Sequence, residues 1–174
     1  HAMWELGRQA NGSPVVTAAF EAGVDGLIER LKASDDPVAN TFLSHLDLFF
    51  RHHGSRGQNE YDLRAPSWEL KPRIALAAID LMRRSDESQA PAVRNVASVA
   101  ERDRVAAEIR DKVAGDADTA ALFEAALKSA QLFLAGRERA KTNVVRVINE
   151  ARVALYEYGR RLVERGILDD VEQL

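Results

Sequence analysis

Three cations share one face of the last predicted helix with apolar side chains. Arg137, Lys141 and Arg152 follow the same three- and four-residue steps as a stripe of apolar residues. The apolar members of this stripe are Phe123, Leu127, Ala130, Leu134, Val145, Ile148, Leu155 and Leu162. A cation on an inward face needs a partner, because burying an unpaired charge costs several kcal/mol. The stripe therefore indicates either ion pairs with snorkelling stems, or a basic pocket for an anion, or a docking face for another domain.

A long loop could supply the partners of these cations. The segment "HHGSRGQNEYDLRAPSWELKP" at 52–72 is rich in Gly, Pro, charge and aromatic residues. Its Glu60 and Asp62 are candidates to neutralise the basic stripe, so we expect the loop to fold back on the long helix. The buried polar network that we predict there contains Arg56, Glu60, Arg137, Glu138 and Lys141. Such a network could form a site, or it could be architecture that fixes the loop.

Aromatic and histidine residues near this loop allow more than one role. Trp68, with Pro66 and Tyr61, could line a pocket for a flat aromatic ligand, but a lone Trp beside Pro is also typical of an anchor that pins a loop to a bundle. His52 and His53 end a predicted helix, where the helix dipole favours a cation. Adjacent histidines point differently and do not form a metal-binding pair at i, i+4 spacing. We assign no catalytic residue and no metal ligand from the sequence.

The elements that position these residues are all predicted to be helices. Helix starts are indicated by Pro after a capping residue at Ser13 and Asp36, and by Pro72 and Pro91. The spacing of apolar residues predicts helices over 13–33, 37–53, from 72, and over 91–113. One long helix is expected from Thr119 to Glu164. We therefore predict an all-α bundle of five or six helices, with a long C-terminal helix and one long ordered loop at about 54–72.

Composition excludes several classes of function. The chain has 174 residues with 24 Lys and Arg against 27 Asp and Glu, a net charge of -3 that does not favour nucleic-acid or anionic-membrane partners. The absence of Cys excludes disulfides, thiolate metal sites and cysteine nucleophiles. No apolar run has the length of a membrane span, and no signal peptide is evident at the start. We expect a cytoplasmic protein, with residues 1–3 as the remnant of an expression tag and 4–174 as a single helical domain.

Two motifs in this chain resemble a known family. The loop resembles the Gly-x-Arg-Gly-x-x-Glu…Pro-x-Trp…Pro stretch of the phosphoenolpyruvate-synthase-like family, and in particular of the rifampin phosphotransferases. The matching loop positions are Gly54, Arg56, Gly57, Glu60, Asp62, Pro66, Trp68 and Pro72. The long helix resembles a second segment of the same proteins at Arg137, Glu138, Lys141, Arg152, Gly159, Leu162, Gly166 and Leu168. The resemblance covers most of 45–170, and residues 4–44 fit it only loosely.

The resemblance implies a part of a larger enzyme. Such enzymes combine an ATP-binding domain, a helical substrate-binding or connecting domain, and a domain with a phosphate-carrying histidine. This chain resembles only the helical domain and lacks the Gly-rich phosphate loop of the ATP domain. The resemblance therefore implies an excised module that is inactive alone. ATP and Mg²⁺ would serve the parent enzyme, and the other domains of that enzyme would be its partners.

Two functions remain open at this point. The chain could hold the phosphoryl acceptor of an ATP-dependent, phosphohistidine-using phosphotransferase. Pyruvate, a rifamycin-like drug and an unknown aromatic metabolite are all possible acceptors. The site candidates are then Arg56, Glu60, Tyr61, Trp68, Arg137, Glu138 and Lys141, with Arg56, Arg137 and Lys141 stabilising the charge of the transferred group. Alternatively, the chain is a non-catalytic structural or interaction module with no ligand of its own.

Overall fold

The computed structural model describes residues 1–173, which form helices and connecting loops without a β-strand in that range. The helices are α1 (Ala2–Asn11), α2 (Pro14–Glu21), α3 (Leu27–Ala33), α4 (Pro37–His53), α5 (Pro72–Arg84), α6 (Pro91–Val113) and α7 (Ala117–Glu164). Two short 3-10 helices, η1 (Glu87–Gln89) and η2 (Val171–Gln173), complete the described chain. The all-α prediction is confirmed, and so is the long helix near the C-terminus.

The chain divides into two compact units. Unit 1 contains His1–Ser85 together with the chain from Val144 onward, and unit 2 contains Asp86–Asn143. Helix α7 contributes its first part to unit 2 and its last part to unit 1. The single helical domain over 4–174 stays a prediction.

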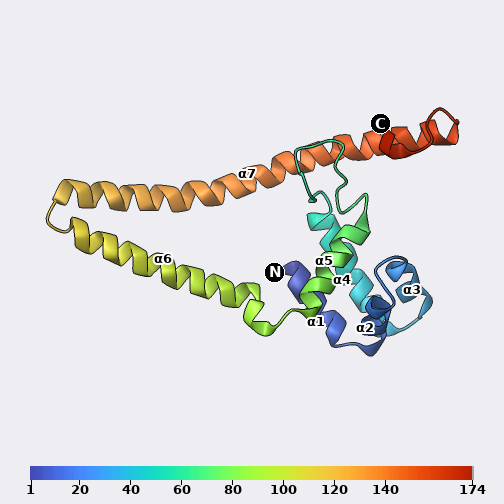
Figure 1. The fold of residues 1–174 in the computed structure, drawn as a ribbon, viewed down its shortest axis with the longest axis horizontal. Coiled ribbons are helices and arrows are strands. Elements are labelled where there is room, and N and C mark those ends of the chain that lie inside the picture. The colour runs from blue at the N-terminus through green and yellow to red at the C-terminus, as the bar shows by residue number, and fades with distance from the viewer. Residues whose placement is uncertain (174) are drawn as a thin grey trace. The chain divides into compact units, whose positions relative to one another are not determined.

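Unit 1 holds the hydrophobic core, which α1 to α5 build together (Figure 1). Phe20 on α2 and Phe42 on α4 meet edge to face, with ring centroids 6.0 Å apart. The other buried apolar side chains of this cluster are Leu6, Ala10, Val16, Ala19, Leu27, Leu31, Ala39, Leu46, Phe49, Ala75, Leu76 and Ile79. Apolar spacing along each helix therefore places one face of each inward.

The helix starts follow the predicted caps. The Ser13 side chain accepts a hydrogen bond from the Val16 amide. The Asp36 carboxylate accepts hydrogen bonds from the amides of Val38 and Ala39 at the start of α4. Each cap satisfies amides that would otherwise lack partners at a helix start. Pro72 and Pro91 occupy the first turns of α5 and α6, as predicted.

The single helix predicted over 13–33 is wrong, because the chain breaks between α2 and α3. Gly23 and Gly26 have φ angles of +100° and +68°, a conformation that glycine adopts without steric cost. The Arg30 guanidinium holds this turn by donating hydrogen bonds to the carbonyl oxygens of Ala19 at 3.0 Å, Gly23, and Asp25 at 2.6 Å. The two glycines outweigh the helical spacing of the apolar residues around them.

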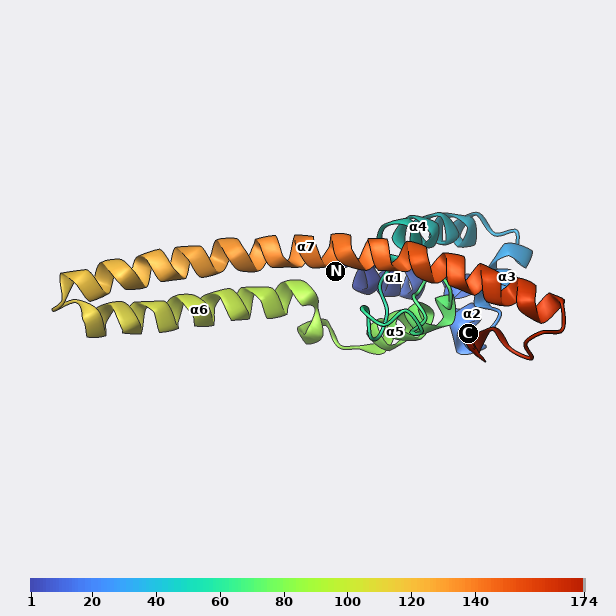
Figure 2. The same ribbon diagram turned by 90° about the horizontal axis from the view of Figure 1, so that it is seen from above.

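Unit 2 is a helical hairpin of α6 and the first part of α7, which run in opposite directions (Figures 1 and 2). Arg110 on α6 pairs with Glu124 on α7 across the hairpin at 2.5 Å. Most of its large apolar side chains are exposed, among them Leu122, Leu132 and Phe133 with exposed fractions of 70%, 65% and 74%. Unit 2 therefore has little core of its own.

Candidate functional site

The loop between α4 and α5 is ordered by pairing at its base. The Trp68 amide donates to the Arg56 carbonyl at 2.8 Å, and the Glu69 amide donates to the Gly54 carbonyl at 2.9 Å. Gly57 and Ser67 form an isolated antiparallel bridge. A Cβ at Gly57 would lie 2.7 Å from the Pro66 carbonyl oxygen, which explains why a glycine stands there. The long ordered loop predicted at 54–72 is confirmed.

Trp68 anchors the loop to the core. Its ring stacks on Phe49 of α4, with centroids 5.8 Å apart and planes 22° apart, and it packs against the buried apolar cluster. The neighbouring Tyr61 is 61% exposed. Neither residue lines the pocket described below, so their contacts agree with the anchor interpretation of Trp68.

Arg152 fastens the tip of the loop to α7. Its side chain is 2% exposed and donates hydrogen bonds only to backbone carbonyl oxygens: Asn59 at 3.2 Å, Glu60 at 2.6 Å, and Asp62 at 2.7 and 2.9 Å. Burial lowers the pKa of the Arg152 guanidinium, and the charges of Asp62 and Glu60 partly offset this effect. An arginine stays protonated at such a site, so its charge is compensated by oriented peptide dipoles and nearby carboxylates.

Two further contacts hold the loop and the end of α4 on α7. The buried Asn149 side chain donates to the Glu69 carboxylate at 2.8 Å, and Arg146 donates to the His52 carbonyl at 3.4 Å. His53 ends α4, where burial first and the charges of His52, Arg56 and Arg146 next lower its pKa. The loop is therefore fixed at its base, at its tip and at its junction with α4.

The predicted buried network needs a correction. Arg56 pairs with Glu60 inside the loop, and the Glu60 side chain is only 10% exposed. Arg137 and Glu138, however, are exposed on the part of α7 that belongs to unit 2, and Lys141 is half-buried there. The cation of the stripe that binds the loop is Arg152, and it binds carbonyl oxygens instead of the predicted carboxylates.

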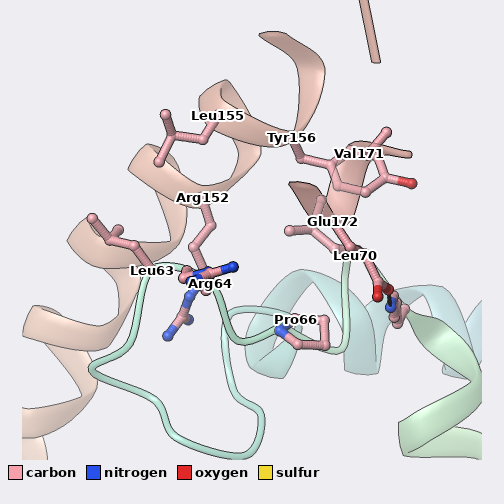
Figure 3. Close-up of a pocket in the computed structure, with 10 residues that line it drawn as sticks. Leu63, Arg64, Pro66, Leu70, Arg152, Leu155, Tyr156, Val171 and Glu172 are labelled. Atoms are coloured by element: carbon pink, nitrogen blue, oxygen red, sulfur yellow. Dashed lines mark hydrogen bonds and ion pairs between the residues drawn. The ribbon is translucent and has the colours of Figure 1, made fainter. Parts of the chain in front are cut away.

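A pocket of about 380 Å³ lies between this loop and the end of α7 (Figure 3). Its lining residues come from the loop, from α7 and from η2. They are Leu63, Arg64, Pro66, Leu70, Lys71, Arg152, Leu155, Tyr156, Val171 and Glu172. Figure 3 shows Arg152 reaching from α7 towards the loop, so the same side chain that fastens the loop also forms part of the pocket wall. The pocket combines mainly apolar walls with a few charged groups, as small-molecule sites do.

The chain matches one known protein family. The sequence model of the rifampicin phosphotransferase fourth domain matches residues 1–138. The chain belongs to this family. No curated protein and no solved structure matches the chain significantly.

The family assignment confirms the resemblance found in the loop motif and extends it. The match includes residues 4–44, which fitted the resemblance only loosely, and stops at 138, near the start of the second motif. The family relationship of the loop therefore rests on the match, and that of Arg152 rests on the second motif alone.

The pocket lies apart from the residues that the sequence indicated as site candidates. Pro66 was named as a possible pocket residue and Arg152 as part of a stripe that could form a basic pocket, but neither was among the seven candidate site residues. The pocket lining includes none of the seven candidates, Arg56, Glu60, Tyr61, Trp68, Arg137, Glu138 and Lys141. Val171 and Glu172 lie about 100 residues beyond the loop, and spacing gives no signal for such a contact.

Replacing Gly57 by Ala is expected to loosen the base of the loop. The added Cβ would need the Pro66 carbonyl to move, and the peptide bridge to Ser67 would open. We expect a loss of about 1–3 kcal/mol in the stability of this region, the usual cost of overpacking. Hydrogen exchange of the Trp68 and Glu69 amides should become faster by a factor of ten or more, on the order of that energy. Unchanged exchange at both amides would contradict the steric role of Gly57.

Proposed function

We propose that this chain is the acceptor-binding domain of an ATP-dependent, phosphohistidine-using phosphotransferase. The observation that carries the proposal is the pocket between the 54–71 loop and α7, in a chain of the rifampicin phosphotransferase fourth-domain family. In this role the chain holds the acceptor, and other domains perform the chemistry of ATP.

The build of the pocket supports the binding of an organic acceptor. Its volume of about 380 Å³ falls in the lower part of the range of small-molecule sites, enough for a small acceptor or for part of a large one. Leu63, Pro66 and Leu155 supply apolar wall. Because Arg152 fixes one wall to the other, a ligand would lose little affinity to ordering of the loop.

The chemistry of phosphoryl transfer is assigned to the parent enzyme. In the described range no three carboxylate or imidazole groups gather as ligands for a metal ion. Arg56 of unit 1, and separately Arg137 and Lys141 of unit 2, stay proposed as cations that stabilise transferred charge, a role that requires no proton transfer. The ATP-binding and phosphohistidine domains are the proposed partners. None of the described helices is long and apolar enough to cross a membrane.

A structural or interaction module is the second candidate. It is favoured by the exposed apolar side chains of unit 2, such as Leu132 and Phe133, and by the architectural role of Arg152. On this alternative the pocket holds no ligand, and the loop serves only to join α4, α5 and α7.

Calorimetric titration of the chain with rifampicin, and separately with pyruvate, distinguishes an acceptor-binding domain from a structural module. We expect saturable binding of one of these compounds, weakened at least tenfold by Leu155→Glu, which places a charge on the apolar wall. The matched control is Val147→Glu, because Val147 is 72% exposed on the same helix and does not line the pocket. Equal affinity of the two variants would exclude the pocket as the site. Absence of binding by both compounds would favour the structural alternative.

A further inference from the structure

Cationic side chains outnumber acidic ones in the lining of the pocket. Three of its lining side chains are cations, Arg64, Lys71 and Arg152, and one is an acid, Glu172. Arg152 is committed to the loop carbonyls. The Arg64 side chain has no hydrogen-bond or ion-pair partner in the described chain, and Lys71 pairs with Glu172. A pocket with apolar walls thus presents one unpaired guanidinium and one ammonium group bound to a carboxylate.

Glu172 reaches Lys71 from a separate segment. It belongs to η2, whose other polar contacts are local: the Glu172 amide donates to the Asp170 carboxylate at 2.7 Å, and the Gln173 side chain accepts from the Asp169 amide at 2.8 Å. The Glu172 side chain is 69% exposed and that of Lys71 is 37% exposed. An ion pair so open to water contributes little free energy. Another carboxylate can therefore replace Glu172 at Lys71 at small cost.

We infer that the pocket takes an organic carboxylate with an apolar body, and that Glu172 occupies at Lys71 the position of the ligand's own carboxylate. The inference rests on the proposed function and names the substrate class of the same site. The apolar body lies against Leu63, Pro66 and Leu155, and the carboxylate pairs with Lys71. Glu172 is then an internal competitor that lowers the affinity of the site for anions.

The choice of a carboxylate follows from the group already present. The Lys71 ammonium binds a carboxylate at the edge of the pocket in this structure, so its position suits that geometry. Charge-assisted hydrogen bonds to an ionised carboxylate are stronger than those to a neutral amide of the same shape. The site should therefore prefer an aromatic carboxylate over the corresponding carboxamide.

The test compares 2-naphthoate with the neutral 2-naphthamide by calorimetric titration of the chain. Wild type is expected to bind the carboxylate more tightly. Glu172→Gln should strengthen naphthoate binding about fivefold, because this factor corresponds to the free energy that an exposed ion pair contributes. The affinity for naphthamide should not change. Lys71→Gln should remove most of the preference. The control is Glu164→Gln, since Glu164 is an exposed acid paired with Arg160 on α7 and does not line the pocket.

The outcomes separate this inference from the proposed function. Equal binding of the two probes, or no change between Glu172→Gln and Glu164→Gln, would overturn the inference while the rifampicin titration could still support acceptor binding. Failure of both probes to bind would also overturn it. If naphthoate binds but Leu155→Glu does not weaken its binding, the carboxylate site lies elsewhere and the inference is wrong.

Discussion

Arg152→Met is expected to lower the free energy of unfolding of unit 1 by about 2–4 kcal/mol. The guanidinium serves three carbonyl oxygens, those of Asn59, Glu60 and Asp62, from a position that is 2% exposed. Removing the donor leaves buried carbonyl groups unsatisfied, which costs about 1–3 kcal/mol for each group that water does not reach. Methionine keeps an apolar stem like that of arginine. The loss of free energy of unfolding therefore measures the contribution of the guanidinium and not that of the packed stem.

The matched control for this prediction is Arg146→Met. Arg146 lies on the same helix, is exposed, and makes one long contact of 3.4 Å to the His52 carbonyl, so its loss should change stability by less than about 0.5 kcal/mol. Because the chain has two compact units, urea unfolding should be followed together with hydrogen exchange of the loop amides. Exchange at Asp62 and Trp68 should accelerate in Arg152→Met only. Equal behaviour of the two variants would show that the loop does not depend on Arg152.

Helix starts were predictable because their signals are local. A capping side chain followed by Pro specifies the first turn of α2 and α4 through contacts within three residues. The break between α2 and α3 was missed because apolar spacing continues across it. Two glycines decided that turn, and Arg30 stabilises it through carbonyl oxygens. Such carbonyl contacts have no signature in the side-chain pattern.

The basic stripe shows where sequence reasoning about the site ends. Spacing correctly places Arg137 and Arg152 on one face of a helix, but the two residues are separated by about 22 Å along the axis at 1.5 Å per residue. The loop contacts the helix only around Arg152, and Arg137 is exposed. Periodicity shows which residues share one face of a helix. It does not show which part of that face other segments of the chain cover.

The pocket was beyond prediction for a related reason. Its walls come from the loop, from α7 and from η2, so no single stretch contains its pattern. The sequence identified the loop as unusual and matched its Pro66 and Trp68 to a family motif. It did not show that Trp68 faces the core at Phe49 while Pro66 faces the pocket.

Gly7→Ala is expected to destabilise unit 1 by about 2–3 kcal/mol, although alanine is the better helix former. A Cβ at Gly7 would lie 2.9 Å from the backbone nitrogen and 3.1 Å from the Cα of Arg83, so the clash is with backbone that cannot turn away. α1 and α5 would have to separate. Separation would also stretch the hydrogen bonds from Arg8 to the Met82 and Arg83 carbonyls at 2.5 and 2.9 Å, and from Asn11 to the Arg83 carbonyl at 2.7 Å.

The opposite result is expected for Gly136→Ala, which provides the control. Apart from its chain neighbours and the backbone of its own helix, no atom lies within 4 Å of a Cβ built at Gly136 inside α7. Alanine there should therefore stabilise the helix by about 0.5–1 kcal/mol, through the lower conformational entropy of the unfolded chain. Both variants replace Gly by Ala within a helix. The difference between their free energies of urea unfolding therefore separates the steric clash at Gly7 from the effect of helix propensity. A stable Gly7→Ala would mean that α1 does not pack on α5 at this distance, and the burial of Leu6 and Ala10 in the core would then also need another explanation.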